Sequence, residues 1–157
     1  GRARIWGGGG DDRVSADSTV ADVAIYGEGG NDHLYGGGEG SSVVDGGPGD
    51  DRLSLGSYGY NPTANGGPGR DVLTLRSATL EANGNLDGGG GDDTLVGQPM
   101  VFGGTLTGGD GDDIIAVNGE SARPGREGSY AVSGGGGLGL GGSTRRSGPA
   151  GAGAGSR

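Results

Sequence analysis

The nine residues GGPGDDRLS, from Gly46 to Ser54, are the stretch that decides the fold. Close copies start at Gly7, Gly27, Gly66, Gly88 and Gly108 and read GGGGDDRVS, GEGGNDHLY, GGPGRDVLT, GGGGDDTLV and GGDGDDIIA. All follow one template, G-G-x-G-x-D-x-U-x with U apolar, and successive starts lie 20, 19, 20, 22 and 20 residues apart. Self-similarity at a fixed period of this size is typical of a solenoid.

Each period also carries two apolar positions that alternate with polar ones. The U position holds Val14, Leu34, Leu53, Leu73, Leu95 and Ile115, and a second series, two residues before each template, holds Ile5, Ile25, Val44, Ala64, Leu86 and Leu106. Such alternation is typical of short strands with one side facing inward. The sequence therefore predicts an all-β fold, a right-handed parallel β-roll or β-helix solenoid with about 20 residues per coil and about six coils over residues 1–117.

The template glycines fit the turn between the two strands of a coil. A tight reversal needs residues with positive φ, which glycine adopts without the steric penalty of a Cβ. Pro48 and Pro68 stand at the variable third position, where a fixed φ is tolerated. The connections at the other end of each coil differ in length and lack the full template. We therefore expect one regular edge and one irregular edge.

The composition limits how this chain can be stabilised. Leu, Ile, Val and Phe together make up 26 of 157 residues, while glycine alone supplies 45 and costs backbone entropy to order. The chain cannot pack a wide core, so something besides apolar burial must hold it together. After Val117 the periodicity stops, and residues 118–157 are rich in Gly, Ala, Ser and Arg. This composition predicts a disordered C-terminal tail.

The charge pattern points to a cation. Formal net charge is −9, and residues 1–117 hold 18 acidic residues against 6 arginines, which gives −12. Stacking coils about 4.8 Å apart would place the template aspartates in one row: Asp12, Asp32, Asp51, Asp71, Asp93 and Asp113. Like charges so close destabilise a compact state unless a counter-ion neutralises them. Calcium between successive turns fits best, because it takes about six to eight oxygens in irregular geometry, whereas magnesium demands a stricter octahedron. The aspartates alone supply too few oxygens, so turn carbonyls must supply the rest.

Several other classes of protein and site are disfavoured. The chain has no cysteine and a single histidine, His33, which excludes disulfides and argues against a zinc site. The acidic body would repel nucleic acid. No run of about 18 apolar residues exists, so we expect no membrane span. The chain opens inside a repeat, and we interpret it as a piece of a longer protein.

The template resembles the RTX repeat, the haemolysin-type calcium-binding repeat, over residues 5–117. The resemblance implies a parallel β-roll that binds calcium in its GGxGxD turns and folds when calcium is present outside the cell. The implied ligands are the six template aspartates, with carbonyls of the turn glycines: Gly8, Gly10, Gly30, Gly47, Gly49, Gly67, Gly69, Gly89, Gly91, Gly109 and Gly111. Six stacked turns would give about five sites between turns.

The chain departs from the family pattern in three ways. The second edge lacks the motif, so we expect ions on one edge only. Arg70 occupies a position that is Asp or Asn in the other copies, so the sites beside that turn should be weaker. Glu28 replaces the second glycine of its turn and is interpreted either as an added ligand or as a tolerated substitution.

Other interpretations of these residues fit the sequence less well. A disordered Gly/Asp linker would not keep Asp and two apolar rows in phase over six copies. An EF-hand loop from Asp110 fails because Ser121 stands where a bidentate Glu is needed. We expect no catalytic role for His33, which stands at an outward template position. Tyr58 and Tyr60 are an alternative, sugar-binding pair in a far-edge loop.

The predicted function is calcium binding by an extracellular module of a secreted bacterial protein. We expect no enzyme in this chain, since no nucleophile or acid/base pair stands apart from the regular carboxylates. Two alternatives stay open for the parent protein: a secreted protease or polysaccharide-modifying enzyme that carries this segment as its C-terminal module, or a surface adhesin that uses it as a stalk. Trp6 and Tyr26, adjacent on one outward row, are interpreted as the contact to a preceding domain, with a simple surface ladder as the alternative.

Overall fold

The computed structural model describes residues 1–18, 22–38, 40–57, 61–77, 84–97, 104–117 and 131–133. The regular elements among these residues are all β-strands: β1 (Arg2–Gly9), β2 (Arg13–Ser18), β3 (Asp22–Gly29), β4 (His33–Gly38), β5 (Ser42–Asp45), β6 (Arg52–Ser57), β7 (Thr63–Pro68), β8 (Val72–Ser77), β9 (Asn85–Gly90), β10 (Thr94–Gly97), β11 (Thr105–Asp110), β12 (Ile114–Val117) and β13 (Ala131–Ser133). Among them, no helix is long and apolar enough to cross a membrane.

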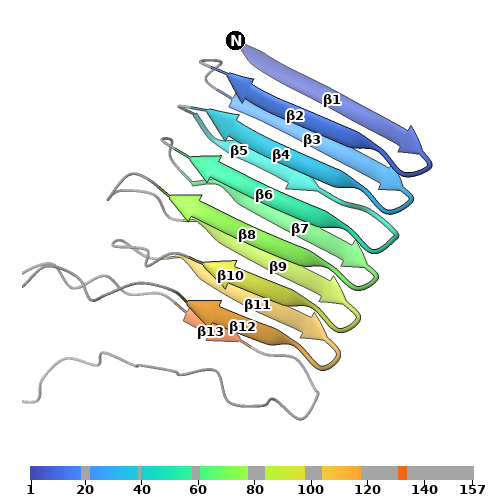
Figure 1. The fold of residues 1–157 in the computed structure, drawn as a ribbon. Helices are drawn as coiled ribbons and strands as arrows, with labels where there is room; N and C mark the ends of the chain where they lie inside the picture. Colours follow the sequence, from blue (N-terminus) through green and yellow to red (C-terminus); the bar gives the residue numbers. More distant parts are fainter. Residues whose placement is uncertain are drawn as a thin grey trace, which may run out of the picture.

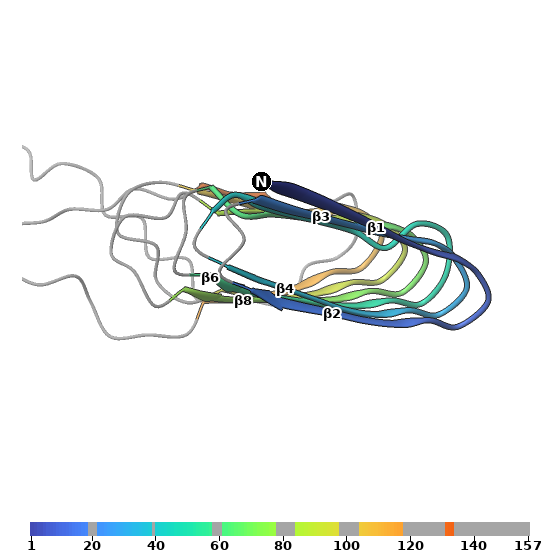
Figure 2. The ribbon, with the colours of Figure 1, turned by 90° about the horizontal axis from the view of Figure 1, so that it is seen from above.

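The strands alternate between two stacked sheets. The odd-numbered strands form one sheet in the order β1-β3-β5-β7-β9-β11-β13, and the even-numbered strands form the other in the order β2-β4-β6-β8-β10-β12. Every pairing within a sheet is parallel. Figure 1 shows the coils descending from the N-terminus, and Figure 2, from above, shows each coil running clockwise from one sheet to the other. The predicted right-handed parallel solenoid is confirmed.

The register places each copy of the template on the one before it. Ile5 pairs with Ile25, Ile25 with Val44 and Val44 with Ala64 in the odd sheet. In the even sheet the U residues form the matching row, from Val14↔Leu34 to Leu95↔Ile115. Because side chains alternate between faces, a one-residue slip would expose both rows, so the apolar pattern fixes the register.

The core is a narrow layer between the two sheets. Its buried apolar residues are Val23, Ile25, Leu34, Val44, Leu53, Leu55, Ala64, Leu73, Leu75, Leu86, Leu95 and Leu106. Leu55 and Leu75, two residues beyond the U position, extend the core beyond the two predicted rows. Glycine takes this place in β4, where a Cβ on Gly36 would lie 2.8 Å from Val44 Cγ2. The apolar core is therefore only a few side chains wide in each coil.

The predicted disordered tail, residues 118–157, lies outside the described residues apart from β13. That strand pairs in parallel with β11, with Val132 opposite Leu106. It continues the odd sheet by one strand beyond the last template.

Candidate metal centre

The six GGxGxD turns lie along one edge of the solenoid, where the strands of the odd sheet pass into those of the even sheet (Figure 2). Positive φ occurs at the second and fourth template positions: Gly8, Gly10, Gly30, Gly47, Gly49, Gly67, Gly69, Gly89, Gly91, Gly109 and Gly111. This confirms the conformation expected of these glycines. Glu28 takes the same conformation at a φ of 74°, so this turn keeps its shape at the cost of the strain that a side chain brings there.

The template aspartates form a continuous hydrogen-bonded row. The backbone N–H of Asp12 donates to Oδ1 of Asp32 at 2.8 Å, and that of Asp32 donates to Oδ1 of Asp51 at 2.7 Å. The same bond joins Asp51 to Asp71, Asp71 to Asp93 and Asp93 to Asp113, at 2.8, 2.8 and 3.0 Å. Each carboxylate after Asp12 is thus held through its Oδ1 by the turn that precedes it in the chain.

Among the described residues, the second carboxylate oxygen of every member of this row is buried and has no hydrogen-bond partner: Oδ2 of Asp12, Asp32, Asp51, Asp71, Asp93 and Asp113. Asp71 is 0% exposed and Asp51 is 1% exposed. Buried polar atoms are nearly always paired, and leaving a charged oxygen unpaired is costly. A row of six such orphans at one repeated position calls for a ligand that accepts electron pairs.

A backbone carbonyl lies beside the orphaned oxygen in five of the six turns, all except the turn of Asp113. A Cβ added to Gly7 would lie 2.7 Å from Asp12 Oδ2 and 2.9 Å from the carbonyl oxygen of Gly27, the first glycine of the next turn. At Gly46 the added atom would collide with Asp51 Oδ2 and with the Gly66 carbonyl oxygen. The first template glycine is therefore required because a carboxylate and a carbonyl occupy the space of its side chain. The Gly66 carbonyl accepts the N–H of Gly47 at 3.1 Å, but the nearby carboxylate oxygen has no donor, and a cation between the two oxygens would relieve their repulsion.

Further carbonyls point along the stack from one turn to the next. A Cβ on Gly49 would collide with the carbonyl oxygen of Gly30, and one on Gly69 would collide with that of Gly49. The second template positions repeat this relation, with Gly67 against the Gly47 carbonyl. No side chain screens these oxygens. Between the turns, the template aspartates and glycines thus present carboxylate and carbonyl oxygens, which is the donor set that calcium prefers.

Burial disfavours the charged form of the central aspartates. Desolvation raises the pKa of Asp71 to about 7 and that of Asp51 to about 6, and the neighbouring carboxylates of the row add to the rise. The hydrogen bond from the preceding turn opposes it in each case. The pKa of Asp93 is also raised, again mainly by desolvation. The row is therefore poorly suited to carry its full negative charge unless a cation neutralises it.

A second row, at the fifth template position, runs alongside the first. Oδ1 of Asp11 accepts the N–H of Asn31 and Oδ1 of Asn31 accepts the N–H of Asp50, both at 2.8 Å. Asp50 and Asp92 accept in the same way from Arg70 and Asp112, at 2.9 Å each. Here each donor lies in the following coil, opposite to the first row. Arg70 has no acceptor atom on its side chain, so it cannot continue this row toward Asp92.

The remaining residues singled out in the sequence do not join this edge. His33 is exposed on β4, and Trp6, which is 57% exposed, stacks on Tyr26 with ring centroids 5.8 Å apart and planes inclined by 16°. Tyr58 and Tyr60 lie outside the described residues. Within the described part of the chain, no three or more His, Cys, Asp or Glu side chains converge on one point that could hold a metal. Any ion at the turns must therefore draw heavily on backbone carbonyls.

The family model described as RTX calcium-binding nonapeptide repeat (4 copies) matches residues 4–18, 22–38, 37–57, 82–98 and 105–119. The chain belongs to the RTX calcium-binding repeat family. The turn that carries Arg70 falls outside the matched residues, in line with its departure from the template. No curated protein and no solved structure matches the chain.

The family binds calcium, and the stacked aspartates of this chain are consistent with ions held between turns. When bound there, calcium would supply positive charge to the orphaned carboxylate oxygens. In the folded roll, the two hydrogen-bonded rows and the positive-φ glycines hold those oxygens and the turn carbonyls in place.

Proposed function

We propose that the chain is a calcium-binding β-roll whose folding depends on calcium, and that it serves outside the cell as a structural or accessory module of a secreted bacterial protein. The observation that carries the proposal is the row of six buried Asp Oδ2 atoms with no hydrogen-bond partner. RTX repeats are typical of secreted bacterial proteins, which supports the extracellular location.

The proposed ligands are the Oδ2 atoms of the aspartate row together with carbonyls of the turn glycines. Six stacked turns leave five spaces between them, so about five ions are expected along this edge. Extracellular modules bind calcium with Kd values of about 10⁻⁴–10⁻³ M. At ten times Kd, each independent site would add about 1.4 kcal/mol, and five sites would add roughly 7 kcal/mol. That sum is comparable to the whole stability of a small domain.

The same reasoning favours binding over catalysis in this chain. The buried carboxylates repeat in equivalent environments, whereas acid/base catalysis needs groups whose surroundings push their pKa values apart. Repetition of one site is what an ion-binding scaffold requires. We therefore place any activity of the parent protein in segments beyond this chain.

A calcium titration followed by far-UV circular dichroism tests the proposal, with magnesium and EDTA as controls. The expected result is a cooperative change from coil to β-structure at sub-millimolar to millimolar calcium, reversed by EDTA and absent with magnesium. A spectrum that stays disordered in 10 mM calcium, or one that responds equally to magnesium, would contradict it.

A further inference from the structure

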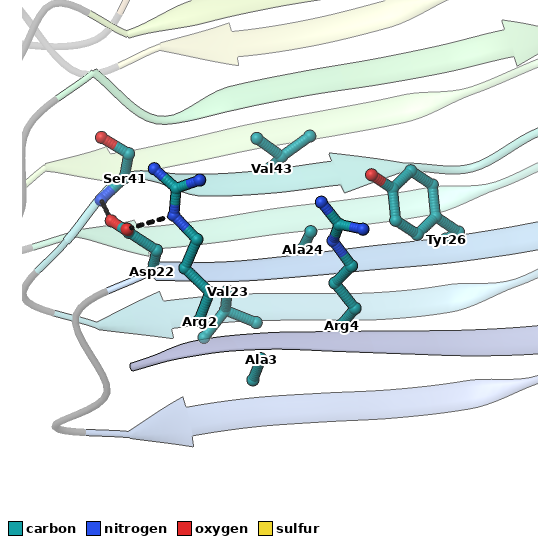
Figure 3. A pocket seen from close by; sticks show the side chains of 9 residues that line it. All are labelled: Arg2, Ala3, Arg4, Asp22, Val23, Ala24, Tyr26, Ser41 and Val43. Atoms are coloured by element: carbon teal, nitrogen blue, oxygen red, sulfur yellow. Dashed lines mark hydrogen bonds and ion pairs between the residues drawn. The ribbon is translucent and has the colours of Figure 1, made fainter.

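A shallow cavity of about 280 Å³ lies on the outer face of the odd sheet, over the first three coils (Figure 3). It is separate from the GGxGxD turns, and the calcium proposal makes no use of it. The residues that matter for its chemistry are Arg2, Arg4, Asp22, Ala24, Tyr26 and Val43.

The hollow follows from the register of three strands. Arg4 of β1 pairs with Ala24 of β3, and Ala24 pairs with Val43 of β5, so one methyl group stands between two longer side chains on the same row. Tyr26, two residues further along β3, adds a taller wall on the same face. The small side chain of Ala24 therefore forms a floor that its neighbours enclose.

The two arginines of the cavity differ in their pairing. Arg2 Nε lies 3.2 Å from Asp22 Oδ2, while Asp22 Oδ1 accepts the backbone N–H of Ser41 at 3.2 Å. Arg4 has no ion pair or hydrogen bond with the described part of the chain. In Figure 3 its side chain crosses β3, and the guanidinium ends between Ala24 and Tyr26. Of the two arginines, Arg4 is thus the one whose guanidinium has no acceptor among the described residues, and it lies beside an aromatic ring.

The apolar surface beside this cation is exposed. Tyr26 stacks on Trp6, which is 57% exposed, and Val43 on the opposite side is 38% exposed. An apolar patch rimmed by polar residues is typical of a ligand site. The stacked pair also stiffens the aromatic wall, so that a ligand meets a surface already in position.

We propose that this cavity binds one carboxylate-bearing sugar residue. Its carboxylate would pair with the Arg4 guanidinium, whose planar fork matches a carboxylate. The C–H face of the ring would pack against Tyr26 and Val43, and its hydroxyls would reach the Tyr26 phenol. The volume lies just below the range for drug-sized ligands and suits a single ring. The strongly acidic body disfavours a polyanion, so the acidic sugar belongs to a glycan that is otherwise neutral.

The test is a calorimetric titration of the calcium-loaded full chain with galacturonic acid, its uncharged methyl ester, galactose and sodium sulfate. Circular dichroism on the same samples verifies that each protein is folded, which separates this proposal from the calcium proposal. Galacturonic acid should bind saturably and about tenfold or more tightly than the ester, galactose or sulfate. Arg4→Gln should lower its affinity about tenfold, and Ala24→Phe, which fills the hollow, should abolish binding.

Arg76→Gln is the matched control, since Arg76 is an exposed arginine of β8 on the other sheet, and it should change the affinity less than twofold. Equal binding of the acid and its ester would remove the role of Arg4. Sulfate that binds as well as the acid would reduce the site to a simple anion site. Unchanged binding by a folded Ala24→Phe variant, or no saturable binding by the wild type, would overturn the proposal.

Discussion

Replacing Asp71 by Asn should allow the β-roll to form with less calcium while lowering the number of ions it holds. Asp71 is 0% exposed, its Oδ1 accepts the Asp51 N–H at 2.8 Å, and its Oδ2 has no partner. An Asn side chain keeps the acceptor, and its amide N–H₂ replaces the orphaned oxygen next to the Gly88 carbonyl. The substitution thus turns a repulsive pair of acceptors into a donor and an acceptor.

The magnitude follows from the pKa of this carboxyl. Burial raises the Asp71 pKa from 3.8 to about 7, and each pKa unit corresponds to about 1.4 kcal/mol, so ionised Asp71 costs on the order of 4 kcal/mol at pH 8. Asp71→Asn removes that cost from the calcium-free folded state. The favourable equilibrium constant for folding in EDTA should rise by up to about a thousandfold.

Trimethylamine N-oxide titrations in EDTA at pH 8, followed by far-UV circular dichroism, measure this change because the osmolyte favours the compact state of a calcium-free chain, and calcium titrations count the ions. Asp87→Asn is the control, since it removes the same charge from an exposed position on β9 and should leave both measurements nearly unchanged. If Asp71→Asn is no more stable than the wild type in EDTA, or if Asp87→Asn stabilises it as much, the cost assigned to the buried carboxylate is wrong.

Three further predictions concern the same edge. Without calcium, protonation of the aspartate row should stabilise the folded chain in place of the ion. The folded-state pKa values of Asp51 and Asp71 are raised to about 6 and about 7, so the stabilisation that comes from protonating them is fully present below about pH 3.8 and is lost as pH rises through 6 to 7. A circular dichroism pH titration in EDTA should show β-structure near pH 4 and coil at pH 8, and the opposite order would refute the sign. Asp51→Ala should remove the two calcium sites that adjoin its turn, while Asp17→Ala, at the other end of β2, should remove none. Equal losses of bound calcium in equilibrium dialysis would contradict a single ion-binding edge. Arg70→Asp should tighten calcium binding at the flanking turns several-fold in calorimetry, because it restores an acceptor for the N–H of Asp92 and removes a cation. Unchanged affinities would mean that the second row does not support the calcium sites.

The sequence predicted the solenoid because each copy of the template carries its own register. One apolar residue on either side of the turn, repeated near every 20 residues, is enough to stack Leu53 on Leu34 and Leu73 on Leu53. The requirement for positive φ at Gly47 and Gly49 was likewise predictable, because only the backbone conformation of a tight turn explains glycine there.

The hydrogen-bond network along the edge of GGxGxD turns could not be predicted in this way. The sequence placed the aspartates in a row but did not reveal that each Oδ1 binds the N–H of the preceding turn and that each Oδ2 has no partner. The role of Asn31 and Asp50 in a second row depends on the direction of backbone N–H groups, which composition does not encode. β13 has no template, and its pairing depends on the open edge of β11.

The opposed directions of the two rows have a consequence for the length of the module. Asp51 donates its N–H to the coil that follows, whereas Asp50 donates its N–H to the coil that precedes, so an interior turn is complete only between two neighbours. Every interface repeats the first-row bond, and all but the one between Arg70 and Asp92 repeat the second-row bond, so an added coil with the full template would join in the same way and, on the proposed arrangement, bring one more ion site. The end coils are the incomplete ones, whatever the copy number. In such an architecture the span of the module can lengthen or shorten in whole coils while its chemistry stays the same.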